Sequence, residues 1–164
     1  MLRNIILSGL VLIAFQTYSQ NLEQIRSDYP LAESSEQVTL RLNDDLASVT
    51  SDQTILMAYK GALKTLQAKF AKKIRDKKEF FKEGVALIEK AIQTEPENVE
   101  LRMIRMTVQE NAPRIVGYND KIDEDKNFIL QNFATITSES IRTTIRNFAN
   151  ISENFDASER ERLD

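Results

Sequence analysis

Apolar residues recur at helical spacing along most of this chain, and the pattern is cleanest over residues 76–98. Small or apolar side chains there fall three or four positions apart, which places them in one stripe on one side of a helix. The stripe consists of Phe80, Gly84, Leu87, Ile88, Ala91 and Ile92. Asp76 and Glu79 have the spacing of an acidic capping box, which predicts that the helix begins at Asp76. Pro96 disfavours the α conformation at Glu95 and predicts the end of the helix there.

A second helix is predicted to begin at Val99, because the side chain of Asn98 can accept a hydrogen bond from a first-turn amide. So short a link makes the two helices an antiparallel pair. Four residues of the first helix and its turn have the offsets found in a tetratricopeptide repeat, namely Gly84, Ile88, Ala91 and Pro96. The region resembles the second helix and following turn of that family over about one repeat. The resemblance implies stacked helical hairpins, although one or two such units do not make the long groove with which the family binds peptides.

The other helices are predicted from shorter stretches of the same period. These stretches run from Ser35 to about Thr50, over residues 53–75 with a stripe from Ile55 to Ile74, over residues 120–134, and onward from a cap at Ser138. No alternating β-period occurs, and no low-complexity linker divides the chain. We therefore predict an all-α fold of antiparallel helical hairpins, arranged as a short tetratricopeptide-like array or as an irregular helical bundle.

The helix that follows Asn98 carries apolar residues on two sides. One stripe consists of Leu101, Ile104 and Val108, and the other of Val99, Met103 and Met106. A helix that is apolar on two sides usually lies inside the fold, so we interpret both stripes as core. The alternative is that the methionine side is an adaptable docking surface, since methionine repacks around varied partners.

The helical domain is predicted to have a less regular segment at each end. The predicted boundaries are 1–19 for a signal peptide, 20–34 for an N-terminal lead-in, 35–151 for the all-α domain and 152–164 for a polar C-terminal tail. The lead-in contains Pro30 and no sustained period. The tail has Phe155 and Leu163 as its large apolar residues, and it is predicted to form a short outer helix or to fray.

The first nineteen residues have the form of a secretory signal. Arg3 supplies a positive start, an apolar run follows over residues 5–15, and Thr17 and Ser19 stand three and one positions before a cut at Gln20. The alternative is an uncleaved anchor, but this run is shorter than the roughly 20 residues that span a bilayer. Because no cysteine stands at the cut, attachment as a lipoprotein is excluded. The sequence therefore predicts export, to the periplasm or out of the cell.

The composition limits the chemistry available to the chain. At 164 residues it is long enough for one domain with a sizeable core. Four glycines and three prolines favour helices over a turn-rich β fold. Because the chain lacks histidine and cysteine, it has no usual general base, no thiolate nucleophile and no ordinary zinc or haem ligands. We expect neither catalysis nor a cofactor.

An acidic run over residues 120–127 has part of the spacing of a calcium-binding loop. If Asp123 is the first ligand, Asp125 and Asn127 take the third and fifth positions. The sixth position, which requires glycine, is Phe128, and the twelfth is Ala134 instead of glutamate. We therefore expect no metal here and interpret the carboxylates as first-turn charges of a helix.

A second short motif, Glu139–Ser140, resembles the catalytic Glu-Ser pair of helical lytic transglycosylases. That family also needs a glycine-rich segment downstream, and residues 141–164 contain no glycine. An enzyme that works through carboxylates is therefore only a residual alternative.

Charge is distributed unevenly along the chain. Residues 60–82 contain nine basic and two acidic side chains and so carry +7, whereas the other 13 basic and 23 acidic residues of the chain sum to −10. The candidate partner-binding residues are Lys69, Lys72, Lys73, Lys77 and Lys78. They suit phosphates of lipid or wall polymer, or an acidic protein surface. The alternative is a solvated helix end whose lysines complement the helix dipole.

These patterns predict an exported, non-catalytic helical scaffold that binds a protein partner. The alternative function is a peripheral envelope-binding protein whose basic segment, residues 60–82, contacts anionic lipid or wall polymer. Nucleic acid is an unsuitable partner, because the chain is predicted to be exported and is acidic overall. The oligomeric state does not follow from the sequence.

Overall fold

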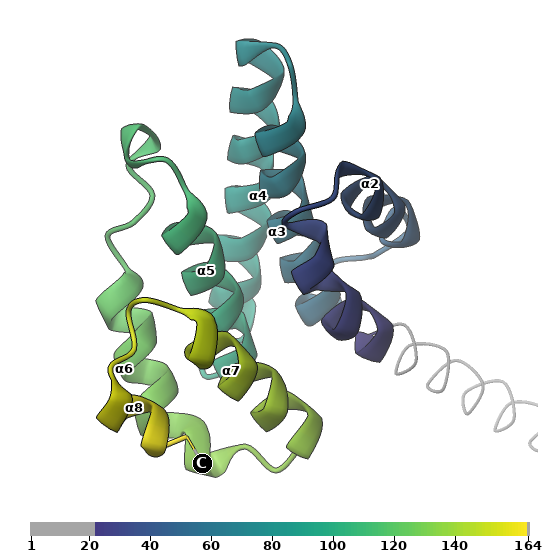
Figure 1. Ribbon diagram of the computed structural model, residues 1–164. Coiled ribbons are helices and arrows are strands. Elements are labelled where there is room, and N and C mark those ends of the chain that lie inside the picture. Colours follow the sequence, from purple (N-terminus) through teal and green to yellow (C-terminus); the bar gives the residue numbers. More distant parts are fainter. Residues whose placement is uncertain (1–21, 164) are drawn as a thin grey trace, which may run out of the picture.

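The computed structural model describes residues 22–163, which form helices joined by turns, with no strand among them (Figure 1). Residues 22–32 are helical and lead into the labelled elements. These are α2 (Glu36–Asp45), α3 (Thr54–Phe70), α4 (Ile74–Thr94), α5 (Val99–Asn111), the 3-10 turn η1 (Arg114–Val116), α6 (Ile122–Asn132), the 3-10 turn η2 (Phe133–Thr135), α7 (Glu139–Ile151) and α8 (Ala157–Glu161). The predicted all-α class is confirmed, and its form is an irregular helical bundle. The predicted signal peptide, residues 1–19, lies outside the described residues.

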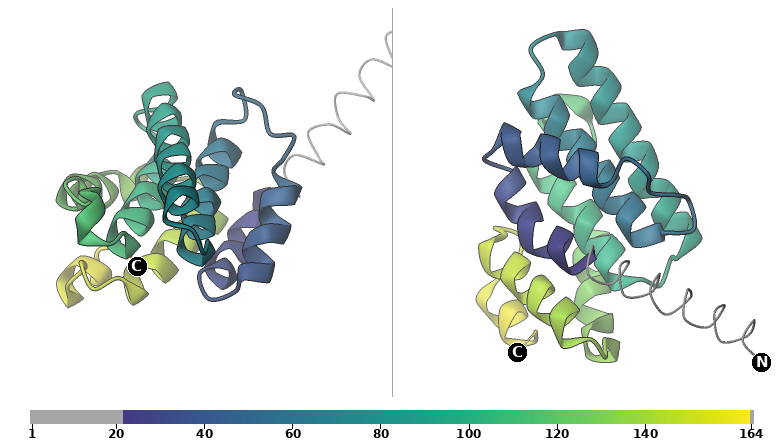
Figure 2. Two further views of the ribbon diagram at one scale, coloured as in Figure 1. Left: turned by 90° about the horizontal axis from the view of Figure 1, so that it is seen from above. Right: turned by 90° about the vertical axis from the view of Figure 1, so that its right-hand side faces the viewer.

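The α3–α4 hairpin is the central element of the bundle. Residues 22–32 and α2 lie on one side of it, and α5 to α8 lie on the other (Figure 1). The two helices are antiparallel, and the turn between them projects beyond the neighbouring helices, as the right-hand view of Figure 2 also shows. None of the helices in the described part of the chain is both long enough and apolar enough to cross a membrane.

Two glycines let α3 and α4 approach each other at backbone distance. A Cβ atom placed on Gly84 would lie 2.4 Å from the carbonyl oxygen of Gly61, and one placed on Gly61 would lie 2.6 Å from that of Gly84. Ile88 and Ala91 are fully buried beside this contact. The small and apolar residues that resemble a tetratricopeptide repeat thus serve the packing of a single helix pair. The described residues give no support for repeated units, so the family resemblance stays a prediction.

Side-chain caps begin three helices where the sequence predicts them. Ser35 accepts from the amide of Val38 at the start of α2, Asn98 accepts from an α5 amide, and Ser138 accepts from an α7 amide. Helix α4 ends at Thr94, immediately before Glu95 and Pro96. These predicted boundaries are confirmed. They could be predicted because each depends on a local signal, a cap or a proline, that acts within a few residues.

The predicted boundary between the two long helices is wrong. Helix α3 ends at Phe70, and α4 begins at Ile74 rather than at Asp76. Lys73 is the N-cap and makes no side-chain cap, while Asp76 lies in the first turn, where its charge suits the helix dipole. Ile74, expected on a buried stripe, is 72% exposed. The turn has neither glycine nor proline, so the helical period continues through it without a signal.

Both ends of the domain are helical, and α8 is the short helix that was one of the two alternatives predicted for the tail. Residues 22–32 form a helix despite Pro30, because Leu22, Ile25 and Ala32 are buried against the rest of the bundle. Helix α2 ends at Asp45, earlier than the predicted Thr50. The C-terminal segment forms the short helix α8 and inserts Phe155 and Leu163 into the core.

Helix α5 lies inside the bundle, as its two apolar stripes predict. Both stripes are buried: Leu101, Ile104 and Val108 on one side, and Val99, Met103 and Met106 on the other. The interpretation of the methionine side as core is therefore confirmed, and the docking alternative is excluded for these residues.

Candidate functional site

The predicted partner-binding residues come together at the turn between α3 and α4. We call this region the basic tip; it consists of Lys69, Lys72, Lys73, Arg75, Lys77 and Lys78, all of which are exposed. Figure 1 shows the turn projecting beyond the other helices, so its side chains reach solvent on several sides. The cluster arises because the last turn of one helix and the first turns of the next are both rich in lysine.

Two of the lysines have structural contacts. The Lys69 ammonium donates to the carbonyl oxygen of Glu33 at 2.9 Å, which ties α3 to the segment before α2. The Lys77 ammonium donates to the carbonyl oxygen of Lys69 at 3.3 Å and so satisfies a free carbonyl in the last turn of α3. The alternative interpretation, a solvated helix end, accounts well for these two residues.

The other basic residues of the tip are free to meet a partner. The side chains of Lys72, Lys73 and Lys78 make no hydrogen bond or ion pair with any other described residue. Arg75 contacts only the adjacent Asp76, at 3.4 Å, and its side chain is 84% exposed. Surface ion pairs of this kind contribute little, so Arg75 can exchange this contact for an external anion at small cost.

An apolar side chain stands among these charges. Ile74 follows Lys73 and precedes Arg75, and it lies in the first turn of α4 at the outer end of the hairpin. Phe80, predicted to belong to the core, is only half-buried, and the Lys64 ammonium lies 5.1 Å from its ring centroid. The outer part of the hairpin therefore combines positive charge with exposed apolar surface.

A shallow hollow of about 140 Å³ lies beside the tip, between α2 and the hairpin. Its walls include Leu40, Phe70, Phe80 and Gln67, and the Gln67 side-chain oxygen accepts no hydrogen bond from any described residue. Pockets for small-molecule ligands usually enclose roughly 300–1,000 Å³. The hollow has room for one or two apolar side chains of a partner, but not for a typical cofactor.

A buried ionic cluster, which the sequence analysis missed, joins the N-terminal helical segment to α3 and α5. Arg26 donates two hydrogen bonds to the Glu100 carboxylate, at 2.7 and 2.6 Å, and Tyr59 donates a third at 3.0 Å. Burial raises the pKa of Tyr59 well above its ordinary value. Because Glu100 and Tyr59 are almost fully buried, no substrate reaches them, and the cluster is structural. The feature of the sequence that could have indicated this cluster is Glu100, a charged residue on a helix with apolar residues on two sides.

A second buried cluster holds α6 against α5 and α4. Arg105 donates to both oxygens of Asp125, at 2.7 and 2.6 Å, and also to Glu89 at 3.1 Å. Tyr118 donates to the other oxygen of Glu89 at 2.6 Å. The predicted first-turn acidic charges are confirmed in α6, and Asp125 is the one turned inward. Among the described residues, no group of three or more acidic side chains is placed to hold a metal ion.

The residual catalytic motif lies at the surface in the first turn of α7. The Glu139 side chain is 73% exposed and pairs with Arg146 at 2.6 Å and Arg142 at 3.5 Å. The Ser140 hydroxyl donates to Glu23 at 2.6 Å, and this hydrogen bond lowers the pKa of that carboxyl. These contacts connect α7 to the N-terminal helical segment and leave Glu139 without the enclosed setting of a catalytic acid.

Glu110 gives the fold a testable dependence on pH. It accepts hydrogen bonds from the Ser152 hydroxyl at 2.5 Å and from the Asn154 amide at 2.7 Å, while burial raises its pKa above the ordinary value of a glutamate. Because folding raises the pKa of Glu110, the folded state binds the proton more tightly than the unfolded state does. The stability that protonated Glu110 provides is therefore lost as the pH rises through its folded-state pKa. We expect Glu110→Gln to raise the melting temperature at pH 7 and to raise it less at pH 4.

Thermal unfolding followed by far-UV circular dichroism at the two pH values measures this difference. Glu161→Gln is the control, because Glu161 is an exposed carboxylate on α8 that does not act on Glu110, and it should change neither melting temperature appreciably. A change of equal size at both pH values for Glu110→Gln would contradict the assignment.

Comparison with protein-family models, curated proteins and solved structures finds no match to this chain.

Proposed function

We propose that this chain is an exported, non-catalytic helical binding protein that contacts an anionic partner through its basic tip. The observation that carries the proposal is the projection of Lys72, Lys73, Arg75 and Lys78 from the free end of the α3–α4 hairpin. The signal-like N-terminal sequence supports the exported location. The absence of histidine and cysteine from the chain supports a non-catalytic binding role.

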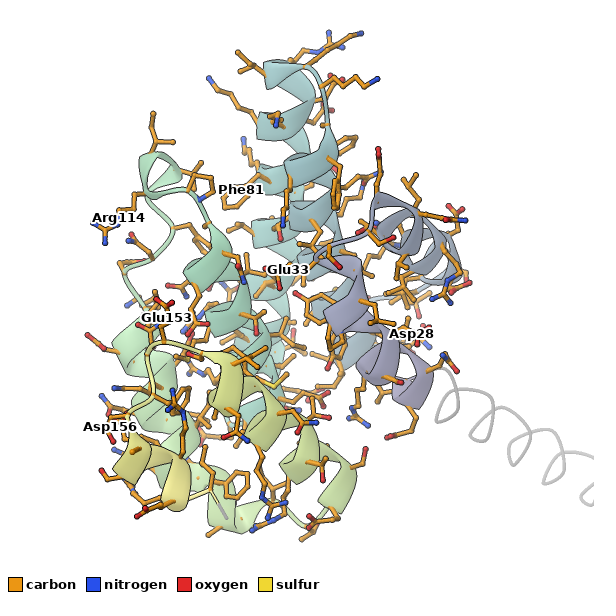
Figure 3. The ribbon with its side chains drawn as sticks, viewed as in Figure 1. Asp28, Glu33, Phe81, Arg114, Glu153 and Asp156 are labelled. Carbon is orange, nitrogen blue, oxygen red and sulfur yellow. The ribbon has the colours of Figure 1, made fainter. Side chains whose placement is uncertain are left out.

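The distribution of charge supports an oriented contact. Residues 60–82 carry +7 and the other residues −10, so the acidic body is repelled by an anionic surface while the tip is attracted. Figure 3 shows Asp28, Glu153 and Asp156 on the body of the molecule, away from the tip. Each lysine near an anionic surface contributes about 1 kcal/mol, and the attraction fades within a Debye length of about 8 Å at physiological salt.

Two classes of partner offer such a surface: phosphate-bearing envelope components and an acidic protein. The exposed Ile74 among the lysines favours an envelope surface. The second candidate, a scaffold that holds a protein partner, is favoured by the hollow beside the tip, where Leu40 and Phe70 offer apolar contact. Salt separates the two candidates, because contact through charge alone weakens strongly between low and moderate salt, whereas a partner seated in the hollow stays bound.

Removal of three tip charges tests the proposal. The triple variant Lys72→Gln, Lys73→Gln, Lys78→Gln is expected to bind its own cell-envelope fraction about a hundredfold more weakly at low salt, since three lysines contribute about 1 kcal/mol each. Binding is measured by co-sedimentation of the purified protein. These side chains are exposed and make no hydrogen bond or ion pair with the other described residues, so helicity should not change.

The matched control removes the same number of charges from the body, by replacing Lys90, Lys121 and Arg162 with glutamine. These residues are exposed and lie on α4 near its end, before α6 and after α8. The control should bind almost as well as the parent. Equal loss of binding in the two triple variants, or no loss in either, would refute the basic tip as the contact.

A further inference from the structure

A second exposed apolar turn lies at the same end of the molecule as the basic tip. It is the η1 connector between α5 and α6, where Ile115 is 94% exposed and Val116 is 44% exposed. Arg114, next to Ile115, is also exposed. Gly117 ends the turn in the left-handed conformation with φ of 65°, and this lets the chain reverse and present Ile115 at the outside of the bend. Figure 3 shows Arg114 pointing outward from this turn.

The position of the connector is tied to the hairpin. The Tyr118 ring meets the Phe81 ring of α4 edge to face, with centroids 6.0 Å apart. The Tyr118 hydroxyl donates to Glu89, which lies about two turns further along the same face of α4. Because both partners are on α4, the same helix that begins with Ile74 also positions the connector. Figure 1 shows both turns at the same end of the bundle, with the hairpin turn extending further than the connector.

We propose that the two turns form one contact surface for an anionic lipid bilayer, with Ile74 and Ile115 entering the boundary between headgroups and acyl chains. Lys72, Lys73, Arg75, Lys78 and Arg114 then lie at the level of the lipid phosphates. This inference rests on the proposed function and names the class of its partner. It adds the connector, which begins 36 positions after Lys78, the last residue of the basic tip, and was not among the predicted binding residues.

The chemistry of the two turns distinguishes a bilayer from the other anionic partners. Singly exposed aliphatic residues are common on protein surfaces. Here each one stands at the outside of a convex turn beside cationic side chains. A wall polymer offers charge without an apolar layer, and an acidic protein would need a recess for each turn. A bilayer presents a continuous layer of phosphates with an apolar layer beneath it. It can therefore bind the cationic side chains and the neighbouring aliphatic side chain of each turn at the same time.

Tryptophan placed at the turns tests the inference, because the natural chain contains no tryptophan to obscure the signal. Ile74→Trp, Ile115→Trp and Ile151→Trp are prepared as separate single variants. Ile151 is the matched control, since it is 77% exposed at the end of α7, away from both turns. Vesicles of phosphatidylglycerol and phosphatidylcholine are added at low salt. We expect a blue shift and quenching by acyl-chain-brominated lipid at positions 74 and 115, and neither effect at position 151.

A second measurement does not depend on the probe. The double variant Ile74→Ser, Ile115→Ser is expected to bind the same vesicles at least about tenfold more weakly, with unchanged helicity because both side chains are exposed. If tryptophan at both turns stays in water and the serine variant binds as well as the parent, the bilayer inference is overturned. Loss of envelope binding in the lysine triple variant would then still uphold the proposed function. If the lysine variant also binds normally, both proposals fail.

Discussion

Replacement of Gly84 by alanine is expected to destabilise the protein by about 2 kcal/mol, although alanine is the better helix former by about 1 kcal/mol. The new methyl group would lie 2.4 Å from the Gly61 carbonyl oxygen and 2.7 Å from the Thr65 methyl carbon. The oxygen belongs to the backbone of α3, so the conflict cannot be relieved by rotating a side chain. The two helices must move apart, and the packing around Ile88 is lost with them.

Urea unfolding followed by circular dichroism measures this loss. Gly117→Ala is the control: no atom lies within 4 Å of the added methyl group, and only the left-handed backbone opposes it, at about 1 kcal/mol. Gly84→Ala should be the more damaging of the two. A variant as stable as the parent would show that α3 and α4 do not approach at backbone distance.

Replacement of Arg105 by methionine is expected to cost about 3–5 kcal/mol, because it leaves the buried carboxylate of Asp125 without its main partner. Asp125 is fully buried and accepts two hydrogen bonds from Arg105. After the replacement, only the more distant contact from Arg102, at 3.3 Å, offsets its charge. Methionine roughly preserves the volume, so the loss reports on charge rather than on a cavity.

The double variant Arg105→Met, Asp125→Leu should recover much of this loss, because neither residue then leaves a buried charge behind. The surface control is Arg41→Met: Arg41 pairs with Asp28 at 2.7 Å, but its side chain is 49% exposed, so the expected loss is below about 1 kcal/mol. If Arg105→Met costs no more than Arg41→Met in urea unfolding, the buried pair does not hold α6 in place.

Local signals account for what the sequence predicts well. The caps at Ser35, Asn98 and Ser138 and the stop before Pro96 act within a few residues, so they can be interpreted without knowing the tertiary structure. The two apolar sides of α5 predict its central position for a similar reason, because a helix must cover every apolar side that it has.

The errors arise where tertiary contacts decide the outcome. The turn at residues 71–73 contains no breaker, and it ends α3 because α4 must fold back for Gly84 to meet Gly61. The helical period therefore misassigned Ile74 to the core. Pro30 suggested an irregular segment, yet burial of Ile25 and the ion pair of Arg26 stabilise a helix there.

In the candidate site, too, the features set by the local sequence could be predicted, and those set by tertiary contacts could not. The charge count predicts which lysines form the cluster, but only the position of the turn shows that they lie at a projecting end. The η1 connector has no charge pattern of its own, and its place beside the tip depends on the contact of Tyr118 with Phe81. The pairing of Arg105 with Asp125 likewise depends on tertiary packing. The sequence indicates only that Arg105 is a charged residue on a helix that is apolar on two sides, which is the setting of a buried ion pair.

The most direct test of contact through the basic tip is co-sedimentation of the purified parent protein and the triple variant of Lys72, Lys73 and Lys78 with anionic and with zwitterionic vesicles. Each titration is run at low ionic strength and at about 0.15 M, where the Debye length is about 8 Å. The account predicts that the parent binds anionic vesicles at low salt, that this binding weakens strongly at the higher salt, and that the triple variant binds weakly throughout. Equal binding of the two proteins, or binding that ignores both lipid charge and salt, would contradict it.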